Sequence, residues 1–256
     1  MRENRPREPE LPRCHHSQHH HLLARIHRRY PTRTDAIVIA GRTFNFTRAA
    51  DPNRVLDEIA ADEDRRERAG GDRKDGDQVH LPYWAELWDS ALGMAQLLIR
   101  HGDMLRCGTA RQPSTVLDLG CGMGLTGMVA ASLGMQLTLA DLEPPALLFA
   151  KLNSLPFSPP ARTLRLNWES TRLEERFDLI LGADILYERA QWDHLEPFWR
   201  AHVNSTGAIL LGEPGRPTGN DFPDWITARG WDLTLHEQAV ATRSQPIRLF
   251  ELRRRV

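Results

Sequence analysis

The 256-residue sequence lacks the features that mark several large protein classes. Its three cysteines, Cys14, Cys107 and Cys121, are not spaced as in a zinc site or a disulfide framework, which favours a reducing, cytoplasmic compartment. The formal net charge is only −1 and no long basic stripe occurs, so nucleic acid is not an expected partner. No apolar run approaches the ~18 residues that cross a bilayer, so we expect no membrane partner either.

Short apolar runs alternate with amphipathic segments through most of the chain. Strands are predicted at 115–119, 135–140, 162–166, 177–184 and 207–212, with a final antiparallel pair at 231–238 and 247–253. Helices are predicted between them at 125–133, 144–153, 191–202 and 221–229. This alternation predicts an α/β fold, a Rossmann-like seven-stranded, mostly parallel sheet with helices on both faces and an antiparallel C-terminal strand pair.

The first 80 residues differ in composition from the rest and divide into two sections. Residues 1–32 are rich in Arg, His and Pro and predict a disordered tail. Transition-metal binding is the alternative for its histidine cluster, but without a rigid scaffold to fix ligand geometry we favour a weakly basic tail. The cluster comprises His15, His16, His19, His20 and His21. Residues 33–80 predict an extension containing a β-hairpin that turns near Ala40-Gly41, a helix at 54–61 and a charged loop.

A strand, a glycine turn and a helix start follow one another between Ser114 and Leu133. Asp118 lies near the end of the strand, and Gly120, Gly122 and Gly124 follow it. Glycines there let the backbone adopt positive φ and approach a ligand closely. Asp141 closes the next strand, where a carboxylate is placed to bind a ribose diol. The arrangement predicts a site for a nucleotide-like ligand.

Two cofactors compete for this arrangement. A dinucleotide fingerprint, G-x-G-x-x-G, would require glycine where this chain has Leu125. The spacing Asp118-x-Gly120-x-Gly122-x-Gly124 instead resembles the S-adenosylmethionine loop of class I methyltransferases. We read Cys121, between two of the glycines, as a small space-filling residue rather than a nucleophile.

Aromatic residues gather before the glycine loop. Pro82 is placed to start a helix that runs to about Ile99. Tyr83, Trp84 and Trp88 stand at its entrance. Core packing is the general expectation for such residues, but a helix leading directly to the glycine-loop strand favours a wall of the cofactor or substrate pocket.

Taken together, these motifs resemble those of the seven-strand class I methyltransferases. Within them, the chain is similar to the family 16 lysine methyltransferase group, in particular the bacterial relatives of the electron-transfer-flavoprotein β-subunit lysine methyltransferase. The motifs that carry the resemblance are Tyr83-Trp84-Ala-Glu86-Leu-Trp88, the glycine loop, Asp141, Asn167-Trp168 and Gly182-Ala-Asp184-Ile-Leu-Tyr187. It covers about residues 80–255, so we expect residues 81–256 to be the methyltransferase domain. Asn167 stands where the family often has Asp.

The resemblance implies S-adenosyl-L-methionine as cofactor and a role for each matched residue. The implied cofactor-binding residues are Trp88, Asp118, Gly120, Cys121, Gly122, Gly124, Asp141, Leu142, Asn167, Trp168 and Ala183. The implied catalytic residues are Asp184 and Tyr187, from an Asp-x-x-Tyr signature that this group shares. Tyr83 and Trp84 are expected to contact the substrate. A helix N-cap is the alternative role for Asp184.

Methyl transfer from a sulfonium is an in-line displacement, in which the protein positions the acceptor and excludes water. The resemblance implies a lysine acceptor, so the partner is a protein with an accessible lysine. Asp184 is placed to orient the amine, and aromatic walls favour a methylated ammonium by cation–π attraction. No metal is required. Two alternatives stay open, a small-molecule N-methyltransferase and a non-catalytic binding module on the same fold, since fold alone does not fix the acceptor.

Overall fold

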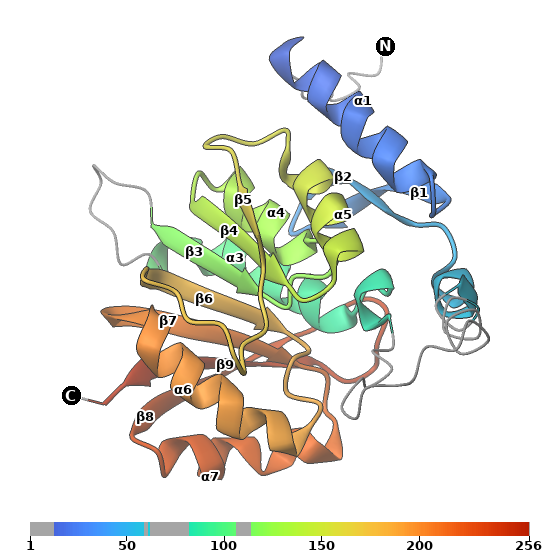
Figure 1. The fold of residues 1–256 in the computed structure, drawn as a ribbon. Coiled ribbons are helices and arrows are strands. Elements are labelled where there is room, and N and C mark those ends of the chain that lie inside the picture. The colour runs from blue at the N-terminus through green and yellow to red at the C-terminus, as the bar shows by residue number, and fades with distance from the viewer. Residues whose placement is uncertain (1–12, 59–60, 62–81, 106–113, 256) are drawn as a thin grey trace, which may run out of the picture.

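The computed structural model describes residues 13–58, 61, 82–105 and 114–255 of the chain (Figure 1). A sheet of seven strands has the order β5-β4-β3-β6-β7-β9-β8. The strands are β3 (Thr115–Leu119), β4 (Gln136–Asp141), β5 (Arg162–Arg165), β6 (Phe177–Ala183), β7 (Val203–Glu213), β8 (Trp231–Gln238) and β9 (Ile247–Arg254). Strands β3 to β7 pair in parallel, and β9 runs antiparallel to both β7 and β8. The predicted fold class is confirmed.

Helices cover both faces of this sheet. One face carries α3 (Asp89–Leu105), α4 (Leu125–Ser132) and α5 (Pro144–Ser154), and the other carries α6 (Trp192–His202) and α7 (Phe222–Thr227) (Figure 1). Successive side chains of the inner strands alternate between the two faces. In β6, Leu179 and Leu181 pack under the first layer while Ile180 packs under the second. Both faces are covered, so the inner strands are apolar almost throughout.

The chain changes direction within the sheet between β3 and β6. From β3 it proceeds outward to β4 and β5, then returns to the other side of β3 to form β6 and β7. Ligands of open α/β sheets bind at such a switch point, beyond the carboxyl ends of the strands. The glycine turn after β3 and residues 184–187 after β6 therefore emerge side by side.

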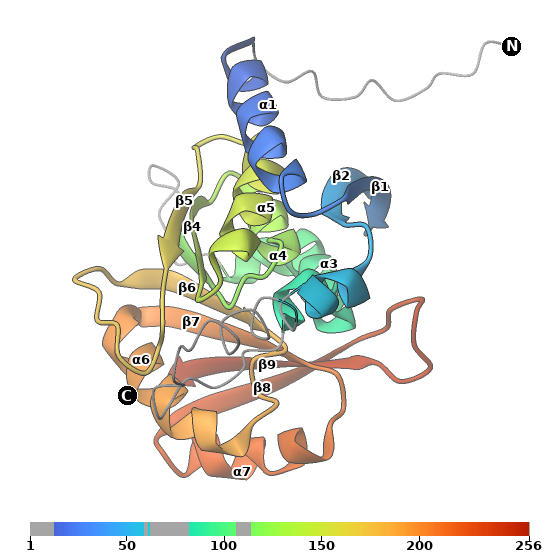
Figure 2. The same cartoon turned by 45° about the vertical axis from the view of Figure 1, so that its right-hand side comes forward.

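The N-terminal section packs on the α3–α5 side of the molecule. Helix α1 (Arg13–His27) contacts α5 near the end that leads into the hairpin (Figure 2), with Leu22 and Ile26 buried at helical spacing. The prediction of disorder across residues 1–32 is therefore wrong for α1, because these apolar residues and Tyr30 supply a packing face that the surrounding His and Arg residues mask in the composition. Residues 1–12 lie outside the described part.

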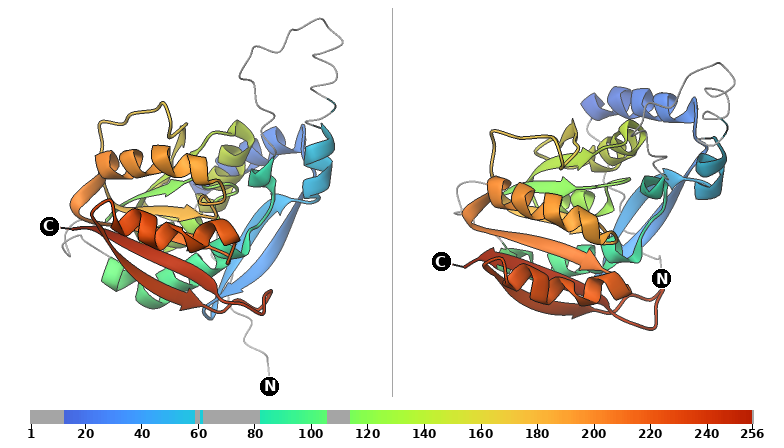
Figure 3. Two further views of the ribbon diagram at one scale, coloured as in Figure 1. Left: turned by 90° about the horizontal axis from the view of Figure 1, so that it is seen from below. Right: turned by 60° about the horizontal axis from the view of Figure 1, so that its bottom comes forward.

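The predicted hairpin is confirmed and forms its own two-stranded sheet. Strands β1 (Thr32–Ile39) and β2 (Arg42–Ala49) pair antiparallel around Ala40 and Gly41, which both have positive φ. The hairpin, blue in both views of Figure 3, lies at the periphery outside the main sheet. Residues 52–58 are helical, close to the predicted helix at 54–61, and the predicted charged loop lies largely outside the described residues.

Helix α3 begins later than predicted. The sequence placed its start at Pro82, but residues Tyr83–Ala85 form a single 3-10 turn, η1, and α3 begins at Asp89. The Trp88 indole Nε1 donates to the Tyr83 carbonyl oxygen at 2.9 Å, and this bond ties the residue before α3 back to the first residue of η1. Two further 3-10 turns are η2 (Arg189–Gln191) and η3 (Pro217–Asn220). Among the described helices, none is long and apolar enough to cross a membrane.

Candidate active site

A cavity of about 580 Å³ opens at the carboxyl ends of β3, β4 and β6. That volume is in the usual range for a small-molecule or cofactor site. Every site residue predicted from the sequence lines it: Tyr83, Trp84, Trp88, Asp118, Gly120, Cys121, Gly122, Gly124, Asp141, Leu142, Asn167, Trp168, Ala183, Asp184 and Tyr187. The structure thus brings together segments that lie up to about a hundred residues apart in the sequence.

The glycine turn forms the floor of the cavity. Gly120, Gly122 and Gly124 have φ of +66°, +52° and +82°, a region that other residues rarely adopt. A Cβ at Gly120 would lie 2.9 Å from the Ile185 side chain, and one at Gly124 would lie 2.7 Å from Ala150. Gly120 and Gly124 therefore require glycine for both conformation and space, and all three glycines line the cavity.

Asp118 anchors the helix that follows the glycine turn. Its Oδ2 accepts the backbone N–H of Gly127 at 2.8 Å, so the carboxylate caps the first turn of α4 from the end of β3. The side chain is almost wholly buried. Burial raises the pKa of Asp118 from 3.8 to about 7, the Gly127 bond opposes this rise, and the nearby Asp141 adds to it. Asp118 fixes the shape of the loop.

Asp141 joins the ends of β3 and β4. Its Oδ2 accepts the Gly122 N–H at 2.8 Å and its Oδ1 accepts the Glu143 N–H at 2.9 Å. Burial raises the pKa of Asp141 from 3.8 to about 6, although the N–H groups of Glu143 and Gly122 lower it. Each carboxylate oxygen retains a lone pair for a further donor, as binding to a diol requires. Burial also raises the pKa of the Cys121 thiol well above 9, in accord with a space-filling role.

Trp168 and Asn167 border the cavity beyond β5. The Trp168 Nε1 donates to Gln191 Oε1 at 2.8 Å, and Gln191 in turn donates to Glu169 at 3.0 Å. Asn167 Oδ1 accepts the Glu169 N–H at 2.9 Å within a turn. These bonds hold the Trp168 ring in one orientation beside the glycine loop.

Three aromatic rings surround the mouth of the cavity. Tyr83 meets Tyr187 edge-on, with ring centroids 5.7 Å apart, and meets Trp88 in the same manner at 6.2 Å. Tyr83 is 47% exposed and Tyr187 37%. Trp84 differs from these three. It lines the cavity, but its ring is buried against Tyr30 and Phe149 and belongs mainly to the hydrophobic core.

Asp184 is held by an arginine from a distant loop. Arg216 donates from Nη2 to both carboxylate oxygens of Asp184, at 2.9 and 3.0 Å, and from Nε to Oδ1 at 3.1 Å. Asp184 has φ of +58°, and its N–H donates to the Gly212 carbonyl at 2.9 Å. No helix begins directly after Asp184, so the alternative role as a helix N-cap is not observed.

The cavity is strongly acidic. Its carboxylates are Glu86, Asp118, Asp141, Glu143, Glu169, Asp184 and Glu188, and no Lys or Arg is among the described lining residues. Such a surface favours a cationic ligand. No group of three or more His, Cys, Asp or Glu residues in the described part of the chain could hold a metal ion, and this includes the exposed histidines of α1.

Comparison with protein families identifies the chain. A model of the lysine methyltransferase family matches residues 82–221, more than half of the sequence. The chain belongs to the lysine methyltransferase family. The match runs from the residue before the 3-10 turn η1 to the residue before α7, and so contains nearly every residue of the cavity.

Two curated members of related groups illustrate the similarity. Protein N-lysine methyltransferase METTL21A of Xenopus tropicalis is 38% identical over 143 residues, 53% of this chain and 62% of that protein. The electron transfer flavoprotein beta subunit lysine methyltransferase of Homo sapiens is 31% identical over 146 residues, 53% of this chain and 50% of that protein. The chain thus spans about half to three fifths of the length of these relatives.

Solved structures agree on the fold. The magnesium protoporphyrin IX methyltransferase of Synechocystis PCC 6803, solved with bound SAM, superposes with a TM-score of 0.52 at 15% identity, covering 81% of this chain and 99% of that one. A putative RNA methyltransferase from Pyrococcus horikoshii superposes with a TM-score of 0.51 at 14% identity, covering 68% and 90%. At this identity the likeness establishes the fold alone.

Several residues in or beside the cavity were not predicted from the sequence. Glu143 and Glu188 each lie within two residues of a predicted site residue, so proximity alone could have indicated them. Phe46 reaches the cavity from the hairpin, outside the family match. Arg216 carries no signal in the sequence, because its partner Asp184 lies 32 positions away and the loop between strand and helix has no distinctive pattern.

Proposed function

We propose that this chain transfers a methyl group from S-adenosyl-L-methionine to the side-chain amine of a lysine in a protein. One observation carries the proposal: a glycine floor with Asp141 and an aromatic mouth with Asp184 and Tyr187 share one cavity. The first set suits a cofactor and the second suits an acceptor amine. Family membership and the printed names of the curated relatives support lysine as the acceptor.

The residues present fit this cofactor. The positive-φ glycines let the chain turn tightly along the cavity, and the acidic lining suits a ligand that carries a sulfonium and an ammonium. When bound, the cofactor would supply an activated methyl group on sulfur. Gly120 to Gly122 would hold its amino-acid part with Cys121 between them, Asp141 and Leu142 its ribose, and Asn167 and Trp168 its adenine. Trp88 and Ala183 would flank it, while Asp118 and Gly124 would shape the loop.

The chain's own side chains would prepare the acceptor. A lysine amine has a reference pKa of ~10.4 and must lose its proton before it attacks. The rings of Tyr83, Tyr187 and Trp88 would line the path of the lysine side chain, and the proton of the amine would leave to solvent at the mouth of the cavity, where Tyr83 and Tyr187 are partly exposed. The Asp184 carboxylate would accept a hydrogen bond from the amine and direct its lone pair inward. Tyr187 would border the same group with its ring.

The compartment and partner form part of the proposal. The three scattered cysteines favour a cytoplasmic location for this chain, and its acceptor would share that compartment. Neither nucleic acid nor membrane is included, because the cavity lining is acidic and would repel phosphate. The acceptor is therefore a protein whose lysine side chain is accessible and long enough to pass the aromatic mouth.

A labelling experiment tests the proposal. The purified chain is incubated with methyl-labelled S-adenosylmethionine and a cell lysate, and the label is followed in the protein and small-molecule fractions. Only two lysines, Lys74 and Lys151, occur in the chain, so self-methylation is readily recognised by intact mass. Asp184→Ala is the test variant, and Asp232→Ala, which removes an exposed carboxylate on β8, is the matched control.

Label on a lysine of a lysate protein, with wild type and the control but not with Asp184→Ala, would support the proposal. Label in the small-molecule fraction alone would replace it with a small-molecule N-methyltransferase. Cofactor binding by calorimetry without transfer to any acceptor would favour a binding module.

A further inference from the structure

The ion pair between Asp184 and Arg216 joins a residue that lines the cavity to one outside the lining. The Asp184 side chain is 6% exposed, and Arg216 binds it through three hydrogen bonds from two nitrogens. A planar guanidinium that engages both carboxylate oxygens fixes the plane of the carboxylate as well as its position. The orientation of the buried Asp184 carboxylate is therefore set by Arg216, a residue from a different loop.

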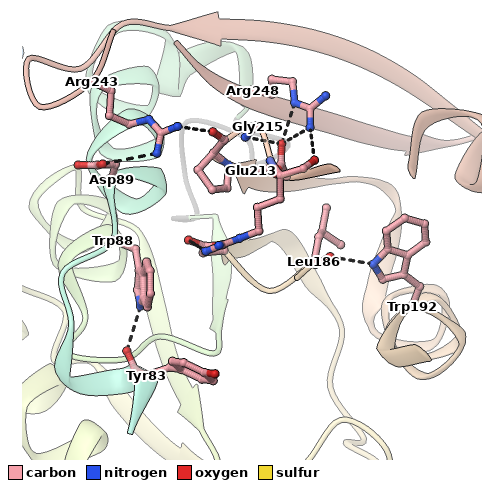
Figure 4. Close-up of polar contacts among 12 residues, drawn as sticks. Tyr83, Trp88, Asp89, Leu186, Trp192, Glu213, Gly215, Arg243 and Arg248 are labelled. Atoms are coloured by element: carbon pink, nitrogen blue, oxygen red, sulfur yellow. Dashed lines mark hydrogen bonds and ion pairs between the residues drawn. The ribbon is translucent and has the colours of Figure 1, made fainter. Parts of the chain in front are cut away.

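The loop that carries Arg216 is itself braced. The buried carboxylate of Glu213 accepts the backbone N–H of Gly215 at 2.8 Å and that of Arg216. Arg248 of β9 binds Glu213, with its Nε 2.7 Å from Oε2, and Arg243 donates to the Pro214 carbonyl and lies 3.7 Å from Asp89 (Figure 4). Strand β9 and the loop before it therefore hold this turn in place.

Arg216 also lies against the aromatic wall. Its Cζ is 5.5 Å from the ring centroid of Trp88, within the range of a cation–π contact. Trp88 is bonded through its indole N–H to the Tyr83 carbonyl, as Figure 4 shows. Arg216 thus connects Asp184 on one side of the cavity with the ring that packs on Tyr83 on the other.

We infer that Arg216 is a positioning residue, which holds the Asp184 carboxylate in the orientation that receives the acceptor amine. The inference rests on the proposed function and adds to it a residue that the Asp-x-x-Tyr signature does not contain. A positioning residue acts through another group, so the effect of its loss disappears once that group is absent.

The charges around Asp184 give the inference a pH signature. Burial raises the pKa of the Asp184 carboxyl, and Arg216 opposes that rise more strongly than any other group. Glu213 raises the pKa of Asp184 further and Arg243 lowers it, and Tyr187 is a titratable neighbour whose own pKa burial and Asp184 raise. Loss of Arg216 therefore raises the pKa of Asp184, and the acid limb of methyl transfer moves to higher pH.

The test compares three arginine substitutions in the full chain. Arg216→Met removes the charge and keeps the apolar stem, and Arg216→Lys restores a charge without the planar fork. Arg229→Met is the matched control, because Arg229 is 39% exposed against 37% for Arg216, pairs with Asp193 at 3.3 Å and stacks 3.9 Å above the Trp225 ring. For each variant the cofactor Kd, kcat, KM and the pH dependence of kcat are measured, with thermal unfolding to verify folding.

We expect Arg216→Met to lower kcat at pH 7 on the order of tenfold or more while the cofactor Kd changes less than about threefold. The loss should shrink as the pH rises, and Arg216→Lys should recover part of it. In Asp184→Asn, the further substitution Arg216→Met should have no additional effect on kcat. Equal activity of Arg216→Met and Arg229→Met at every pH, or additive losses in the double variant, would overturn the inference.

An activity-free measurement separates this inference from the proposed function. The titration of Asp184 is followed by NMR of Cγ-labelled aspartate in wild type and in Arg216→Met, with Asp184→Asn to assign the signal. A higher midpoint in Arg216→Met supports the inference even if no acceptor is found. An unchanged midpoint overturns it even if wild type methylates lysine. If Arg216→Met does not fold, Arg216→Lys is titrated instead. A midpoint identical to that of wild type would then show that the two-nitrogen contact of the guanidinium with Asp184 is not needed, and would overturn the inference.

Discussion

Replacing Asp118 by Asn removes a carboxyl group whose ionisation destabilises the folded chain. Asp118 is almost wholly buried, and burial raises its pKa from 3.8 to about 7. A carboxyl whose pKa is raised on folding binds its proton more tightly in the folded state, so its contribution to stability is complete below pH 3.8 and is lost as the pH rises towards 7. The asparagine amide oxygen retains the bond from the Gly127 N–H.

The size of the effect follows from the shift. One pKa unit corresponds to ~1.4 kcal/mol, so the raised pKa of Asp118 lowers the stability of the folded chain by about 2 kcal/mol at pH 5, where the folded carboxyl stays protonated, and by about 4 kcal/mol at pH 8, where it must ionise. The difference, about 2–3 kcal/mol, is absent in Asp118→Asn. For a protein of this size it corresponds to a relative gain in Tm of roughly 4–12 °C between pH 5 and pH 8.

Thermal unfolding of the cofactor-free proteins between pH 5 and pH 8 measures this directly. The quantity compared is the Tm of Asp118→Asn minus the Tm of wild type, in which contributions from other groups largely cancel. Asp232→Asn, at an exposed carboxylate paired with Arg255, controls for the loss of one negative charge. A Tm difference that does not vary with pH would mean that Asp118 is ionised throughout, and the argument from burial would then fail.

Three further predictions concern the cavity and the residues that support it. Asn153→Ala should lower the free energy of unfolding by about 2–4 kcal/mol in urea titrations, because Asn153 bonds to the backbone of Thr47 twice and to the Met123 carbonyl once. The cofactor Kd should rise up to about tenfold per pH unit below pH 6, measured by calorimetry, because the pKa of Asp141 is about 6 and a protonated carboxyl loses an acceptor; in Asp141→Asn the Kd should be higher and flat over this range. Tyr187→Ala should lower kcat at least about tenfold with little change in cofactor Kd, in single-turnover assays.

Each of these has a result that would contradict it. Equal urea midpoints for Asn153→Ala and wild type would mean that the hairpin does not depend on this side chain. A cofactor Kd of wild type that is constant from pH 5 to pH 7 would remove Asp141 as the ribose-binding carboxylate. If Tyr187→Ala weakened cofactor binding as much as it lowered turnover, Tyr187 would belong to the cofactor half of the cavity.

The parts of the site that sequence predicts are those encoded locally. A strand, its terminal acid and the glycines after it lie within ten residues, so Asp118, Gly120 and Gly122 could be assigned from spacing alone. The tips of parallel strands meet at one edge of a sheet, so Asp141 and Asp184 could be placed beside them once the strands were recognised. The same logic explains why the sheet was predicted correctly.

The parts that could not be predicted depend on long-range packing. Helix α1 has a polar composition, and only contact with α5 makes its few apolar residues sufficient for folding. The late start of α3 depends on the bond from Trp88 to the Tyr83 carbonyl, which a helical pattern does not reveal. The pairing of Arg216 with Asp184 joins two loops that only the sheet order brings together.

The flanks outside the family match brace the two halves of the cavity separately. On the N-terminal side, Asn153 joins the β2 backbone to Met123 in the glycine loop, so the hairpin supports the floor where a cofactor would lie. On the C-terminal side, Arg248 of β9 holds Glu213, and Glu213 holds the turn that presents Arg216 to Asp184. These two sets of braces share no residue. Changes in the hairpin should therefore alter cofactor affinity before turnover, and changes in β9 should alter turnover before cofactor affinity.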